Sequence, residues 1–319
     1  MSVFANIHSA ARKFILELPL VRQTRKMYWT VHRNNRLLEV INANIQFLAD
    51  SPQVTLTKNI LNIMADEYVS KHLHNNLRHS EPGRLSRYER QIFSQSGEDG
   101  IIEEIFARIG TTNQFFVEFG VGNGLENNSV YLLAKGWRGY WIDANPEWIP
   151  NIEEDFRALL ATKQLLVQQA FITAENIESL FQWANVPDEF DLLCIDIDGN
   201  DYWVWKAIAS YRPRVVVIEY NALFGPGVRW ARQYDPAATW NRTSYYGASL
   251  KSLEVLGNDK GYHLVGCNFA GVNAFFVRQD LISDAFCAPF TAENHYEPTR
   301  HHLIRSIGHR RGFGDFVRP

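Results

Sequence analysis

The sequence has few cysteines and no long apolar run, and each scarcity excludes a class of protein. The 319 residues include three cysteines, Cys194, Cys267 and Cys287, at wide and irregular spacings. An odd number at such spacings excludes a disulfide framework and a cysteine zinc cluster, and it suits a reducing compartment. No stretch approaches the length of about 18 apolar residues that a membrane span needs. We therefore expect a cytoplasmic protein without a membrane span.

An excess of positive charge is also absent. The 32 Lys and Arg residues against 35 Asp and Glu residues give a net charge of −3. A generic binder of polyanions is basic, so the charge balance disfavours nucleic acid as a partner. The sequence is 46% hydrophobic and 21% charged, which is typical of a globular chain and not of a disordered one. At this length it can bury a large core without disulfides or metals.

Glycine is nearly missing from residues 1–90, which contain only Gly83. Apolar residues recur at helical spacing in 37–50 and again in 59–74, and this predicts amphipathic helices. We interpret 1–90 as a helical extension that packs on the main domain or joins copies of the chain into a homo-oligomer. Residues 91–280 form the main domain, and 281–319 form a basic C-terminal tail.

Strand and helix patterns alternate from residue 94 onward, and this alternation predicts an α/β fold with a mostly parallel sheet. The last two strands follow one another without a helix, which indicates an antiparallel edge. The expected strands are 115–120, 138–144, 164–171, 190–198, 214–221, 262–267 and 273–278. The expected helices are 97–108, 126–136, 146–161, 174–184, 201–211 and one that opens within 243–261.

The strongest local signal is a glycine-rich turn, Val117-Glu-Phe-Gly-Val-Gly-Asn-Gly124, between a predicted strand and a predicted helix. Glycines there let the backbone turn tightly and approach a ligand closely. The third glycine comes one residue earlier than in a dinucleotide-binding fingerprint. The acidic residues Glu118 and Glu126 suit a cationic or hydroxyl-rich ligand better than a pyrophosphate. A tight turn without any ligand is the alternative.

An acidic residue, Asp143, ends the next predicted strand, about 20 residues beyond the glycines. A carboxylate in that position can hold a ribose diol. Together with Glu118 and the glycine turn, it indicates an adenosine-type ligand without phosphate. S-adenosylmethionine fits this description, because its sulfonium is cationic and its ribose diol is free.

Further carboxylates gather where the fourth and fifth predicted strands end. Asp196, Asp198 and Asp201 surround one turn, and Glu219 and Asn221 follow the next strand. Because strand side chains alternate, Asp196 and Asp198 are expected on one side. Such hard oxygen ligands suit Mg²⁺, Ca²⁺ or Mn²⁺. The alternative is a turn in which Asn200 or Asp201 caps the following helix.

Several segments in order resemble the FkbM-type class I S-adenosylmethionine-dependent methyltransferases. They are SQSGEDGIIEEIFARIG, VEFGVGNGLENNS, GWRGYWIDANPE, LLCIDIDGNDYWVW and VVVIEYN, within about residues 93–280. The resemblance implies a Rossmann-like seven-stranded sheet and methyl transfer. It implies that the cofactor is bound by Gln95, Glu98, Glu118, Gly120, Gly122, Asn123, Gly124, Asn128, Asp143, Ala170, Phe171 and Asp196. Among these, Asp143 would hold the ribose, and Ala170 and Phe171 would lie near the adenine.

The carboxylates also look like those of metal-dependent O-methyltransferases of the catechol and macrolide-sugar type. There, an Asp after the fourth strand and an acid-plus-amide pair after the fifth hold Mg²⁺. The resemblance implies a divalent metal at Asp196, Asp198, Glu219 and Asn221, although this chain has Glu219-Tyr220-Asn221 in place of an adjacent pair.

A divalent metal would lower the pKa of an acceptor hydroxyl. Asp196 or Asp198 would then accept the proton as the catalytic base. The acceptor is expected to be a small molecule, such as a sugar or glycan. The alternatives are a metal-independent methyltransferase, a nicotinamide dehydrogenase and a non-catalytic assembly protein that keeps the fold.

Overall fold

The structure is a computed structural model that describes residues 52–304 and 311–314. The helix predicted at 37–50 lies outside the described residues, as do 305–310 and 315–319 of the predicted basic tail. The chain divides into two compact units, residues 1–64 and 65–319. The helix predicted at 59–74 is confirmed: it is α4, Pro52–Val69, followed by a π-helical turn at Ser70–His74.

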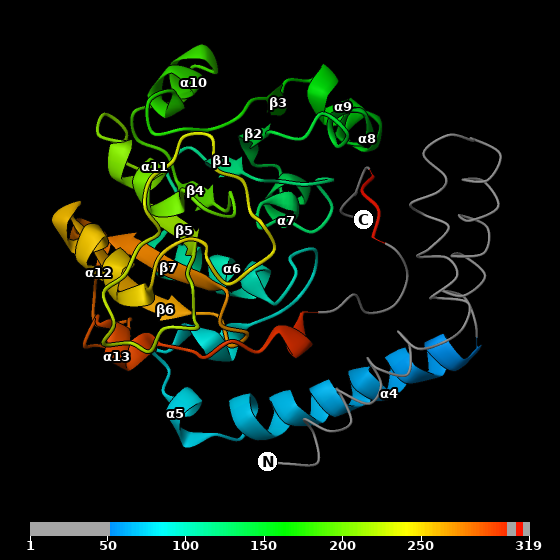
Figure 1. Ribbon diagram of the computed structural model, residues 1–319, viewed down its shortest axis with the longest axis vertical. Coiled ribbons are helices and arrows are strands. Elements are labelled where there is room, and N and C mark those ends of the chain that lie inside the picture. Colours follow the sequence, from blue (N-terminus) through cyan, green and yellow to red (C-terminus); the bar gives the residue numbers. More distant parts are fainter. Residues whose placement is uncertain (1–51, 305–310, 315–319) are drawn as a thin grey trace. The chain divides into compact units, whose positions relative to one another are not determined.

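The second unit contains a seven-stranded sheet, which confirms the predicted Rossmann-like α/β fold (Figure 1). Its strands are β1 Phe115–Phe119, β2 Arg138–Asp143, β3 Leu165–Gln169, β4 Leu192–Ile195, β5 Val215–Glu219, β6 Tyr262–Cys267 and β7 Asn273–Arg278. Their spatial order is β3-β2-β1-β4-β5-β7-β6. Strand β7 runs antiparallel to both neighbours, and the other described pairs are parallel. The predicted antiparallel hairpin is therefore present. Of its two strands, only β6 is an edge strand, because β7 lies between β5 and β6.

Helices cover both faces of the sheet, as the apolar character of the central strands requires. Val117 and Leu193 belong to one buried cluster, whereas their chain neighbours Phe116 and Leu192 belong to the other. The first face packs against α10 Ile177–Trp183, α11 Asp201–Ala207 and α12 Leu250–Asp259. The second packs against α6 Glu98–Ile109, α7 Val130–Ala134, α8 Ile149–Asp155 and α9 Arg157–Ala161. Short helices and turns complete the described part: α5 Leu77–Ser80, α13 Ala292–His295, Leu85–Tyr88, Gln279–Leu281 and His301–Leu303.

Two predicted helices differ from those observed. The helix expected at 146–161 is divided into α8 and α9, because Phe156 leaves the helical conformation (φ −110°, ψ 20°) and buries its ring in the core. The helix expected at 126–136 begins only at Val130. Residues 65–90, assigned to the extension, belong to the second unit, where Leu85 lies in the core.

A buried carboxylate stabilises the end of the sheet at which β1, β4 and β5 begin. Asp191 accepts hydrogen bonds from the backbone N–H groups of Thr112, Asn113 and Gln114, and it pairs with the Arg214 guanidinium at 2.9 Å. This network fixes how the three strands align. The carboxyl ends of the same strands are consequently held together at the opposite end of the sheet, where an open α/β sheet places its ligand site.

None of the described helices combines the length and apolarity that a bilayer-spanning helix needs.

Candidate functional site

The glycine-rich turn brings the ends of β1 and β4 into close contact. Gly120 adopts a positive φ of 68°, and a Cβ placed on it would lie 1.7 Å from the carbonyl oxygen of Asp196. Only glycine lets the two backbones approach this closely. Gly122 also has a positive φ, 56°, but a Cβ there would meet open space. Its backbone N–H donates to Asp143 Oδ2 at 2.8 Å, so the turn is tied to the end of β2.

A cavity of about 290 Å³ opens beside this turn, at the carboxyl ends of β1 and β4. That volume is close to the lower limit for small-ligand sites. The structure brings most of the predicted cofactor residues together around it. It is lined by Gln95, Glu98, Glu118, Gly120, Val121, Gly122, Asn123, Glu126, Asn127, Asn128, Trp148, Asp196, Val272 and Asn273. Four of these side chains are carboxylates, and none of the described residues that line the cavity is basic.

Four predicted cofactor residues do not line this cavity. Gly124 faces the core, where a Cβ would lie 2.9 Å from the Trp141 ring. Asp143 is buried behind the turn, with its carboxylate accepting the backbone N–H groups of Gly122 and Asn145 at 2.8 Å each. Ala170 and Phe171 follow β3, and 42% of the Phe171 surface is exposed.

Six lining residues are absent from the predicted cofactor set. Three of them, Val121, Glu126 and Asn127, lie in or just after the predicted glycine turn, and the other three are Trp148, Val272 and Asn273. Val272 and Asn273 reach the cavity because β7 lies beside β5. The Asn273 carboxamide donates to Glu98 Oε1 at 3.0 Å, and Asn268, in the turn before β7, donates to the same oxygen at 2.9 Å. These contacts join α6 to β7. No local motif marks them, since they depend on a pairing between distant strands.

The carboxylate of Glu118 organises the chain that follows the glycine turn. It is 3% exposed and accepts hydrogen bonds from the Asn128 N–H at 2.7 Å, the Ser129 N–H at 3.0 Å and the Asn127 carboxamide at 2.9 Å. Residues 126–129 wrap around this carboxylate, which is why helix α7 starts later than predicted. Burial raises the pKa of Glu118 to about 7, although the hydrogen bonds partly oppose the shift.

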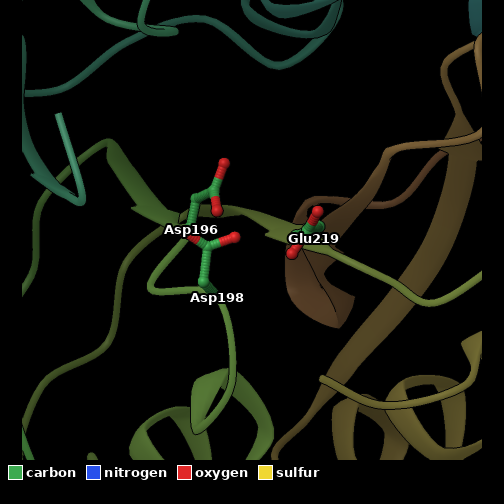
Figure 2. A group of neighbouring side chains, drawn as sticks. All are labelled: Asp196, Asp198 and Glu219. Carbon is green, nitrogen blue, oxygen red and sulfur yellow. The ribbon is translucent and has the colours of Figure 1, made fainter. Parts of the chain in front are cut away.

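Asp196 of the cavity lining also belongs to a cluster of three carboxylates. Figure 2 shows Asp196, Asp198 and Glu219 pointing toward one another, and one oxygen of each lies within 4.8 Å of the others. Asp196 and Asp198 do not come together through the predicted alternation of side chains along a strand. Strand β4 ends at Ile195, and Asp198 adopts a left-handed conformation with φ 58°, so a loop brings the two aspartates together.

Asp201 stabilises that loop. Its carboxylate accepts the backbone N–H groups of Ile197 and Gly199 at 2.8 Å each, so it binds the loop ahead of helix α11. The side chain of Asn200 makes no capping bond to α11 and instead donates to the Asp235 carbonyl at 2.8 Å. The predicted side-chain cap is therefore not observed at the start of α11, and the Asp201 carboxylate binds the preceding loop instead.

The cluster carries unfavourable charge in the absence of a cation. Burial, and then the neighbouring carboxylates, raise the pKa values of Asp196 and Glu219 well above their usual range. The pKa of Asp198 is raised as well, by burial and then by Asp201 and Asp143. The Oε2 atom of Glu219 is buried and has no hydrogen-bond partner among the described residues. The cluster must therefore bind protons or a cation.

Asn221, the fourth predicted metal ligand, has other partners in this structure. Its carboxamide nitrogen donates to the carbonyl groups of Ser244 at 2.9 Å and Tyr246 at 3.1 Å, and its oxygen accepts the Leu223 N–H at 3.1 Å. Asn221 thus holds the 244–246 segment. Burial, and then the carboxylates of Glu219 and Asp196, raise the pKa of the Tyr246 phenol.

The chain matches no protein-family model and no curated protein. It is similar to solved structures, among them an S-adenosylmethionine-dependent methyltransferase from Clostridium acetobutylicum, at 12% identity over 67% of this chain and 97% of that chain, with a TM-score of 0.35. Another is a precorrin-6y C5,15-methyltransferase from Geobacter metallireducens, at 13% identity over 59% and 92%, with a TM-score of 0.34. These similarities are too weak to place this chain in a family.

Proposed function

We propose that this protein is an S-adenosylmethionine-dependent O-methyltransferase that acts, with the help of a divalent metal, on a hydroxyl of a small molecule such as a sugar. The observation that carries the proposal is the charge of the cavity. Four carboxylates line it and none of the described lining residues is basic, although the Glu126 carboxylate pairs with the Arg311 guanidinium at 3.5 Å. A cluster of three carboxylates shares Asp196 with the cavity. Such a lining disfavours phosphate-bearing cofactors and favours a cation.

The residues present fit S-adenosylmethionine. Its sulfonium and its ammonium are both cations, and Glu98 and Glu118 are two buried carboxylates in one cavity. Gly122 leaves the space in front of the turn open, because a side chain there would project into it. We assign the ribose to the neighbourhood of Asp143, as the sequence predicts, although the Asp143 side chain is buried behind the turn and does not line the cavity in this structure. Its carboxylate already accepts two backbone N–H groups, but each oxygen retains a further acceptor site.

The carboxylate cluster fits a hard divalent cation such as Mg²⁺. Three oxygen ligands from Asp196, Asp198 and Glu219 lie close enough to share one ion. The unpartnered Oε2 of Glu219 is an acceptor that such an ion would satisfy. We leave Asn221 out of this ligand set, because its carboxamide holds the 244–246 segment.

The proposed chemistry uses both features. A divalent cation at the cluster would lower the pKa of an acceptor hydroxyl. Asp196 or Asp198 would accept the hydroxyl proton, directly or through a water molecule. The turn at Gly120, which touches the Asp196 backbone, would hold the methyl donor in line with the acceptor oxygen.

Calorimetry tests the cofactor directly. We expect S-adenosylmethionine and S-adenosylhomocysteine to bind with one site per chain, and NAD⁺ to give no heat. Glu118→Gln is expected to weaken the binding of S-adenosylmethionine more than that of S-adenosylhomocysteine, because the sulfur of S-adenosylhomocysteine carries no charge. If neither ligand binds at millimolar concentration, or if NAD⁺ binds instead, the proposal is wrong.

The affinity for S-adenosylmethionine is also expected to depend on pH. Without ligand, Glu118 takes up a proton as the pH falls below about 7. A bound cation stabilises the carboxylate and so lowers its pKa, which means that binding releases a proton below that pH. Affinity should therefore be constant above pH 7 and fall by up to about tenfold per pH unit below it.

Calorimetry in two buffers of different ionisation enthalpy counts the released protons. Glu126→Gln is the matched control, because Glu126 lines the same cavity but is 40% exposed. The pH dependence should disappear in Glu118→Gln and persist in Glu126→Gln. A dependence that survives in Glu118→Gln would assign the proton to another group.

A further inference from the structure

Arg232 has a buried guanidinium nitrogen without a hydrogen-bond partner from the described residues, and it lies close to the proposed acceptor site. It lies in the segment between β5 and α12. Its Nη1 atom is buried and has no hydrogen-bond partner among the residues that the structure describes. A buried guanidinium nitrogen without a partner is costly unless a ligand supplies one.

The backbone of Arg232 is fixed on two sides. Its N–H donates to the Gly247 carbonyl at 2.9 Å, and its carbonyl accepts the Trp203 indole N–H at 2.7 Å. The preceding residue, Ala231, forms a β-bridge with Ala248. The guanidinium lies 5.1 Å from the centre of the Tyr245 ring. The side chain is therefore built into position and is not a loose surface arginine.

The Arg232 guanidinium lies beside the loop that carries Asp198. A Cβ on Gly199, the residue after Asp198, would lie 3.0 Å from Arg232 Nη1. Gly247, whose carbonyl accepts the Arg232 N–H, follows Tyr246, whose own carbonyl accepts the carboxamide of Asn221 just after β5.

We infer that Arg232 binds an oxyanion, a carboxylate or a phosphate, carried by the acceptor whose hydroxyl is methylated at the cluster. This inference rests on the proposed methyl transfer and specifies its substrate class. A planar guanidinium forms paired, charge-assisted hydrogen bonds with either group. An oxyanion would also complete the hydrogen bonds that Arg232 lacks. The alternative, that Arg232 only stacks on Tyr245, predicts no preference for charged acceptors.

The test compares three hydroxyl compounds that differ in charge: glucose, glucuronate and glucose 6-phosphate. Binding to the protein saturated with S-adenosylhomocysteine and Mg²⁺ is measured by ligand-observed NMR and calorimetry. We expect at least one of the two anions to bind at least tenfold more tightly than glucose. The preference between glucuronate and glucose 6-phosphate identifies the oxyanion as a carboxylate or a phosphate.

Two variants separate the role of Arg232 from a general effect of charge. Arg232→Gln should bring the favoured anion to the affinity of glucose, and Arg232→Lys should restore part of the difference. Arg229→Gln removes an exposed arginine of the same segment and should change nothing. Both glutamine variants should bind S-adenosylhomocysteine like the unmodified protein.

The outcomes distinguish this inference from the proposed function. If S-adenosylhomocysteine does not bind, the proposed function fails. If it binds, but glucose binds as well as both anions, or no compound binds, the inference about Arg232 is overturned while methyl transfer stands. The same holds if Arg232→Gln retains the preference for an anion.

Discussion

Replacing Asp196 with asparagine is expected to remove most methyl transfer while making the metal-free protein more stable. Asp196 belongs to both the cavity and the carboxylate cluster, and it is the proposed proton acceptor. Loss of a proton acceptor typically costs about 10²- to 10⁴-fold in rate, and loss of a metal ligand adds to this. Stability changes in the opposite direction, because the amide removes a buried charge that Asp198 and Glu219 repel.

The stability of the metal-free protein is expected to depend on pH through Asp196. Burial and neighbouring carboxylates raise the pKa of Asp196 in the folded protein, so the folded state binds a proton more tightly than the unfolded state. The free energy of unfolding of the metal-free protein therefore falls as the pH rises from the ordinary carboxyl pKa through the raised one. This fall should be smaller in Asp196→Asn. Thermal denaturation in chelator, at pH values across that window, measures the difference.

Added metal supplies the matching control. Mg²⁺ or Mn²⁺ should raise the free energy of unfolding of the unmodified protein by about 3 kcal/mol at a metal concentration 100 times the Kd. Its Tm should rise accordingly. Asp196→Asn should lose most of this increase. The account of the cluster is contradicted if metal leaves the Tm of the unmodified protein unchanged and if Asp196→Asn also keeps full activity.

The sequence predicts the parts of this site that depend on local patterns. Glycines between a strand and a helix indicate a ligand turn, and Glu118 and Gly122 do line the cavity. Acidic residues after β4 and β5 were expected to meet, because parallel strands end at one edge of a sheet. Asp196, Asp198 and Glu219 do so, even though the loop conformation at Asp198 replaces the predicted alternation.

Contacts between residues that are far apart in the sequence cannot be predicted from local patterns. Asn273 reaches Glu98 because β7 enters the sheet between β5 and β6, and no property of the β7 sequence encodes that neighbour. Asn221 was assigned as a ligand by its place after β5, but an amide can equally bind backbone carbonyl groups, and here it holds Ser244 and Tyr246. Side-chain type and spacing do not decide between these partners.

The largest loss of stability is expected from Gly120→Ala. The added methyl group would lie 1.7 Å from the Asp196 carbonyl oxygen, and the residue would keep a positive φ of 68°. Both backbones would have to move, although each belongs to the turn after a central strand. We expect a loss above about 4 kcal/mol, which for a unit of this size lowers the Tm by more than about 10 °C or prevents folding.

Gly136→Ala is the matched control for this substitution. Gly136 also has a positive φ, 88°, but a Cβ there would meet nothing within 4 Å, because the residue ends helix α7 at the surface. It should cost only the conformational strain of about 1 kcal/mol. Soluble yield and thermal denaturation of the two variants, measured side by side, separate strain from steric overlap. Equal Tm values would mean that the β1 and β4 turns do not approach each other as closely as described, and the cavity built on that approach would lose its basis.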